Sequence, residues 1–113
     1  MKDSNEFLYH NNIEIENVGD GVTRQIMGYN NDMMLVKVEF QTNSIGDIHS
    51  HPHTQSSYVV SGRFEVNIDG NKQILSAGDG FFVAPDKPHG VVCIEAGILI
   101  DAFSPTRKDF LKD

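Results

Sequence analysis

Hydrophobic and polar residues alternate along most of the chain, which is the period expected of half-buried β-strands. The clearest example is the segment 34–40, in which every second residue from Met34 to Phe40 is apolar and Lys37 and Glu39 occupy the opposite face. Similar short runs follow one another, separated by Gly, Asp, Asn and Pro turns. The pattern predicts about eight to ten strands and an all-β fold, either a β-sandwich or a small β-barrel of the jelly-roll kind.

Several glycines are interpreted as turn residues that divide the second half of the chain into separate short strands. The Asp69-Gly70 dipeptide accepts the positive φ angles of a type I′ turn and predicts a tight hairpin. Gly62 is expected to end the strand 57–61, and the segment 95–97 is expected to be a turn between the strands 91–94 and 98–103.

The two ends of the chain are expected to lie outside the strands. Residues 1–12 are polar and predict a loose arm, or an arm that packs on a partner. At the other end Ser104 and Pro105 have the order of a helix cap followed by proline at the first helical position, which predicts a short helix over 105–111.

Length, charge and cysteine content narrow the class of protein. A chain of 113 residues fits one domain, 1–113, with a single core. The net charge of −7 disfavours nucleic-acid binding, which depends on clustered Lys and Arg. No apolar run is long enough to span a membrane and no signal peptide begins the chain, so a cytoplasmic protein without a membrane partner is expected. The lone Cys93, among apolar neighbours, predicts a buried and inert thiol.

A cluster of histidines carries the candidate chemistry. His49, His51 and His53 occupy alternate positions and Gln55 continues the same phase. Residues two apart in an extended segment share a face, so two or three imidazoles converge there. His89 follows a proline-marked loop and completes the group. Imidazoles with a nearby oxygen donor suit one divalent transition metal, which could be Ni, Zn, Fe, Co or Mn.

These residues resemble the two motifs of the cupin family. The first motif runs from His49 and His51 through Gln55 to Gly62, and the second runs from Gly78 to His89. The resemblance covers residues 34–103 and implies a small β-barrel with a metal in its mouth, held by His49, His51, Gln55 and His89. Gln55 replaces the usual glutamate, and Asn43 replaces the glycine expected before the first histidine.

The segment 100–111 resembles the tail of the KdgF-like pectin-degradation cupins. Members of that group convert 4,5-unsaturated monouronates, left by pectin and alginate lyases, into linear keto acids. The resemblance implies a small anionic sugar substrate, a linear 5-keto-4-deoxyuronate product and a homodimer. It also implies roles around the substrate for Asp101 as acid or base, Arg107 as carboxylate clamp and Phe103 as apolar wall.

Alternatives stay open for both the residues and the function. Asp101 lies mid-strand with Leu99 and Phe103 on its own face, where an unpaired charge is costly, so it could be catalytic or simply paired with Arg107. His53 could be a fourth imidazole ligand or a neighbour of the site. A non-catalytic sugar-binding cupin is the alternative function, and a cupin dioxygenase is a weaker one.

Overall fold

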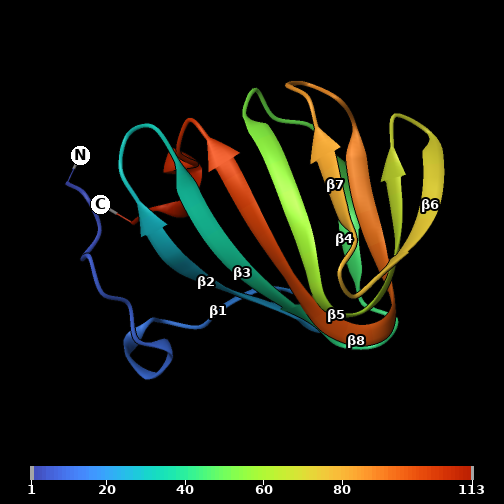
Figure 1. Ribbon diagram of the computed structural model, residues 1–113, viewed down its shortest axis with the longest axis horizontal. Coiled ribbons are helices and arrows are strands. Elements are labelled where there is room, and N and C mark those ends of the chain that lie inside the picture. The colour runs from blue at the N-terminus through green and yellow to red at the C-terminus, as the bar shows by residue number, and fades with distance from the viewer. Residues whose placement is uncertain (1, 113) are drawn as a thin grey trace.

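The computed structural model describes residues 2–112, which form an eight-stranded antiparallel sheet folded into two layers (Figure 1). The strand order is β1-β2-β3-β8-β5-β6, with β4 paired to β8 and β7 paired to β5. The strands are β1 (Glu16–Gly19), β2 (Val22–Tyr29), β3 (Met34–Phe40), β4 (Ile45–His49), β5 (Thr54–Ile68), β6 (Asn71–Ser76), β7 (Gly80–Val83) and β8 (His89–Ser104). The all-β jelly-roll prediction is confirmed, although the sheet does not close into a complete barrel.

The long strands β5 and β8 belong to both layers. The first half of β5 and the second half of β8 pair with each other and lie beside β3 and β7, whereas their other halves lie beside β4 and β6. Figure 1 shows both strands curving from one layer into the other. A residue of β5 or β8 is therefore held in place by hydrogen-bonded strands on both sides.

The bend in β5 and β8 corrects the prediction that Gly62 and the segment 95–97 are turns. The register between the two strands shifts between Val59 and Arg63, where β5 bends without reversing. Gly62 has a φ of 82°, and a Cβ added there would lie 2.5 Å from the carbonyl oxygen of Glu95. Glycine is therefore needed both for its positive φ and for the close approach of the strands.

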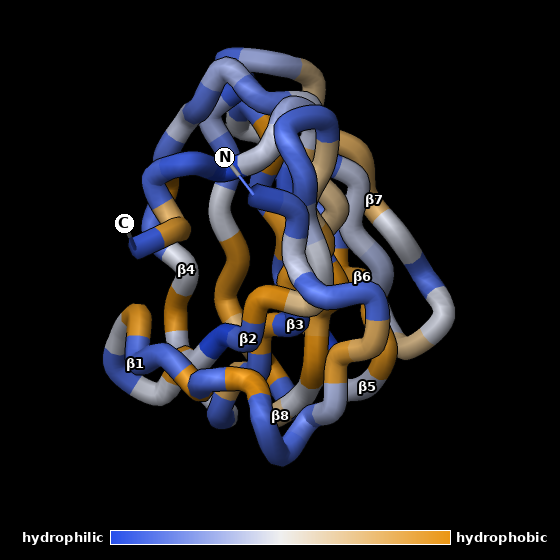
Figure 2. The backbone as a smooth tube through the Cα atoms, turned by 90° about the vertical axis from the view of Figure 1, so that its left-hand side faces the viewer, coloured by the Kyte–Doolittle hydropathy of each residue, from blue (hydrophilic) through white to orange (hydrophobic). Residues whose placement is uncertain are grey.

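The core fills the space between the layers. In β3 the predicted alternation is confirmed, because Met34, Val36 and Phe40 are buried. Phe40 packs edge-on against Phe64, with 5.2 Å between the ring centroids. Figure 2 shows hydrophobic residues along the strands and hydrophilic residues in many of the connecting loops. Full burial of a side chain such as Phe64 stabilises the fold by about 1.5–3 kcal/mol.

The Asp69-Gly70 turn has the predicted form. Asp69 and Gly70 have φ angles of 53° and 88°, and Ile68 pairs with Asn71 across the hairpin. Positive φ at both central residues is the signature of the type I′ turn.

Both ends of the described chain differ from the predictions. The arm is not loose over residues 2–12, because the Ser4 N–H donates to the Tyr29 carbonyl and the Gln25 amide donates to the His10 carbonyl. Met1 lies outside the described residues. The helix predicted over 105–111 is wrong: it is a single 3-10 turn, η2 (Lys108–Phe110). Ser104 is still paired with Thr54 at the end of β8 and cannot cap a helix.

Within residues 2–112, no helix has the length and apolar character needed to cross a membrane.

Candidate metal centre and pocket

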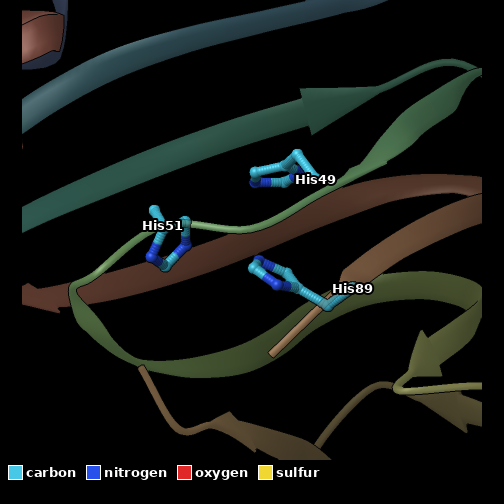
Figure 3. Close-up of side chains that lie close together, drawn as sticks. All are labelled: His49, His51 and His89. Atoms are coloured by element: carbon cyan, nitrogen blue, oxygen red, sulfur yellow. The ribbon is translucent and has the colours of Figure 1, made fainter. Parts of the chain in front are cut away.

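Three histidines converge at one end of the sandwich (Figure 3). His49 ends β4, His51 follows in the next loop, and His89 begins β8 directly opposite His49 in the strand register. The ring of His89 lies 4.4 Å from that of His49 and 4.8 Å from that of His51, measured between centroids. One ring nitrogen from each lies within 4.8 Å of the others. The structure thus brings together the three imidazoles that the sequence predicted.

The backbone selects which nitrogen each imidazole offers. Nδ1 lies 2.8 Å from the Asp47 carbonyl in His49, 3.1 Å from the His53 carbonyl in His51 and 2.9 Å from the Lys87 carbonyl in His89. A carbonyl can only accept, so Nδ1 carries the proton in all three rings. Nε2 is then left with a free lone pair, which is the form in which histidine binds a metal.

Burial keeps two of these rings neutral. Loss of water contact lowers the pKa of His51, although its contact with Gln55 acts in the opposite direction. Burial likewise lowers the pKa of His89, against the effect of its bond to the Lys87 carbonyl. Neutral imidazole, not imidazolium, is the form that a metal requires.

Gln55 lies beside the histidines, in β5. Its Oε1 is 2.9 Å from His51 Nε2, and its Nε2 donates to the Ser57 hydroxyl at 3.0 Å. With the His51 proton on Nδ1, two acceptor atoms face each other, an arrangement that a shared cation stabilises.

His89 gives a second indication that the site fits a metal. Among the described residues its Nε2 is buried and has no hydrogen-bond partner. A buried polar atom is almost always satisfied in a native protein, and an ion at the centre of the three rings would supply the missing partner. The three histidines could therefore hold one metal ion, and their chemistry suits several transition metals without selecting one.

A cavity of about 480 Å³ opens beside this centre. Its volume is within the range of sites for small molecules. Apolar residues of β2, β3 and β8 make up much of its wall, and its polar lining residues include some from β5, β8 and the tail. Its lining includes His49, Gln55, His89, Asp101, Phe103 and Arg107.

Asp101 is a carboxylate of the cavity wall. It lies in β8 directly opposite Ser57, whose hydroxyl donates to Asp101 Oδ1 at 2.6 Å. Removal from water raises the pKa of Asp101 from 3.8 to about 6, against the lowering effects of Ser57 and of the Arg107 charge. The carboxyl group can therefore both hold and release a proton near neutral pH.

Arg107 is buried between two aromatic rings. Its guanidinium carbon lies 5.0 Å from the Phe103 centroid and 4.1 Å from the Phe110 centroid. Its ion pair is with Asp109, through Nε at 3.0 Å and Nη2 at 2.9 Å. The described residues therefore show no Asp101–Arg107 ion pair, and Arg107 Nη1 makes no hydrogen bond among them.

Several site features were not predicted. Ser57 continues the two-residue period of Gln55, so the alternation itself could have found it. Arg24 lines the same cavity and its guanidinium carbon lies 3.8 Å from the Phe110 centroid, but an arginine in a strand gives no local signal. His53 lies outside the three-histidine group, and its carbonyl supports His51.

The antiparallel sandwich with three imidazoles at its mouth defines a class of small metal-binding β-proteins. Residues 36–101 match the family described as cupin domain. The pectin degradation protein KdgF of Dickeya dadantii is 47% identical over 98 residues, which cover 85% of this chain and 89% of that protein. The chain therefore belongs to the cupin family and, within it, to the KdgF-like pectin-degradation proteins.

Solved structures agree with this assignment over nearly the whole chain. An RmlC-like cupin from Shewanella frigidimarina superposes with a TM-score of 0.95 at 49% identity and covers 98% of this chain and 100% of its own. KdgF from a Halomonas species superposes with a TM-score of 0.90 at 37% identity and covers 96% and 100%.

Proposed function

We propose that this protein catalyses the metal-dependent ring opening of 4,5-unsaturated monouronates, from pectin or alginate breakdown, to linear 5-keto-4-deoxyuronate. The observation that carries the proposal is Asp101, a carboxyl group with a pKa of about 6 in the wall of a cavity shared with the histidine cluster. Similarity to proteins named for pectin degradation supports the substrate class.

The cavity has the features that an unsaturated uronate needs. Arg107 is charged, buried and held in place by Asp109, so its free N–H groups can bind the sugar carboxylate. Phe103 offers an apolar surface for the ring, and its own ring lies 5.6 Å from that of His51. Substrate anchored at these two residues would lie between Asp101 and the histidines.

The reaction is a proton transfer without net oxidation. Opening of the hemiacetal removes the proton from O1, forms the C1 aldehyde and breaks the bond between C1 and the ring oxygen. The ring oxygen leaves as an enolate at C5, which becomes a ketone when C4 gains a proton. Asp101 can accept the first proton and return one to C4, because its raised pKa makes both directions accessible near neutral pH.

His49, His51, Gln55 and His89 would hold the divalent metal. A metal bound there supplies Lewis acidity that stabilises negative charge on a substrate oxygen. None of these four side chains is an acid, so the full dipositive charge of the metal would remain available to an anionic ligand.

The ultraviolet absorbance of the C4=C5 double bond of unsaturated galacturonate provides the test. We expect metal-loaded protein to accelerate its decay, and Asp101→Asn to slow that decay by at least about 100-fold, the typical contribution of a positioned acid or base. Asp32→Asn, in an exposed turn, is the matched control. Decay at the spontaneous rate would contradict the proposal, and sugar binding without turnover would identify a sugar-binding cupin instead.

A further inference from the structure

A chain of hydrogen bonds links the candidate metal centre to Asp101 through Ser57. It starts at His51 Nε2, passes Gln55 Oε1 at 2.9 Å, and continues from Gln55 Nε2 to the Ser57 hydroxyl at 3.0 Å. The Ser57 hydroxyl then reaches Asp101 Oδ1 at 2.6 Å. Ser57 is the only link in this chain that neither offers an atom to the metal nor lines the cavity.

The strand geometry explains why Ser57 reaches both neighbours. Gln55 and Ser57 are two residues apart in β5, so their side chains share the inner face. Ser57 lies opposite Asp101 in the register with β8. Gln55 and Ser57 are each only 5% exposed, so water is a poor substitute for any of these contacts.

The direction of each bond follows from Asp101. An ionised carboxylate can only accept, so Ser57 must donate its single proton to it. The Ser57 oxygen is then free to accept, and it takes an N–H from the Gln55 amide. That bond turns the amide nitrogen away from the histidines and leaves Oε1 facing them.

The orientation matters because the two ends of a carboxamide are nearly equal in size and opposite in chemistry. Oε1 can bind a cation, whereas the NH₂ group repels one. We infer that Ser57 is a positioning residue that fixes the orientation of the Gln55 carboxamide and so sets how tightly the site holds its metal. This inference rests on the metal site of the proposed function, but it does not depend on the uronate reaction.

The affinity of the protein for Co²⁺ alone, measured by competition with a chromophoric chelator, tests the inference. We expect Ser57→Ala to weaken Co²⁺ binding by about 10–100-fold, the usual effect of losing a partner of a metal ligand. Ser56→Ala, the same substitution on the outer face of β5, should leave the affinity unchanged. Because no sugar is present, failure of the uronate assay leaves this result interpretable.

A double-mutant cycle separates orientation from general packing. In the Gln55→Glu background both ligand oxygens are equivalent, so Ser57→Ala should change Co²⁺ affinity by less than about 3-fold. An equal loss in both backgrounds, or no loss in the Gln55 background, would overturn the inference. If Ser57→Ala does not fold, the isosteric pair Ser57→Thr and Ser57→Val replaces it, and only the valine variant should bind Co²⁺ weakly.

Discussion

The raised pKa of Asp101 predicts how the stability of the metal-free protein depends on pH. Because the folded state favours the protonated carboxyl, this group contributes stability below pH 3.8 that is lost as the pH rises through about 6. Asp101→Asn removes the titration and keeps the shape of the side chain. The variant should therefore gain stability relative to the wild type as the pH increases.

The magnitude follows from the size of the pKa shift. A change from 3.8 to about 6 corresponds to about 3 kcal/mol at 1.36 kcal/mol per unit. About 1.6 kcal/mol of this is already lost at pH 5 and nearly all of it at pH 8. The free energies of unfolding of the two proteins should therefore diverge by about 1.4 kcal/mol between these two pH values.

Urea denaturation in the presence of a chelator, at pH 5 and pH 8, measures this divergence. Groups common to both proteins, such as Asp109 with its pKa lowered by the bond to Arg107, cancel in the comparison. Parallel profiles of wild type and Asp101→Asn would refute the reasoning, because they would mean that Asp101 titrates as it does in the unfolded chain.

Three other changes have defined outcomes. Gly62→Ala should lower the free energy of unfolding, measured by urea denaturation, by more than about 2 kcal/mol. Gly70→Ala, at a similar φ of 88° but with open space around it, should cost only the backbone strain of about 1–2 kcal/mol. Equal losses would contradict the close approach of β5 and β8. A metal at 100 times its dissociation constant should stabilise the wild type by about 2.7 kcal/mol, seen as a higher Tm, and an equal shift in His89→Ala would exclude His89 as a ligand. Arg107→Lys should raise KM for the uronate about 10–100-fold with a smaller effect on kcat, because lysine lacks the planar guanidinium group that binds a carboxylate through two hydrogen bonds. An unchanged KM would show that Arg107 does not bind the substrate.

The sequence predicted those parts of the structure in which a local residue pattern is compatible with only one conformation or one kind of site. Alternation in β3 fixed its buried face, and the two-residue spacing of His49 and His51 predicted their convergence, although His53 has the same spacing and lies outside the group. The conformation of Asn43, which stands where the resemblance expects a glycine, was not predicted, and the structure gives it a φ of 71°. Asparagine is one of the few other residues that accept this conformation.

The rest required knowledge of the partner strand. Gly62 indicates a positive φ, but a glycine can either end a strand in a turn or bend a continuous strand. Only the pairing of β5 with β8 shows that Gly62 bends the strand. Ser104 and Pro105 have the composition of a helix start, yet the ladder to Thr54 continues through Ser104. The tail then follows the turn before β3, where the Thr106 hydroxyl donates to the Met33 carbonyl. In each case a long-range contact overrides a local preference.

The sharing of β5 and β8 between the two layers has a consequence for the dynamics of the molecule. Because the same two strands run through both layers, we expect that separating them would disrupt both layers together. Gln55, His89 and Asp101 all lie on this pair, and contacts between strands so distant in sequence form late and slowly in folding. Amide protons of β5 and β8 should thus exchange with solvent only through global unfolding, together with loss of the metal centre.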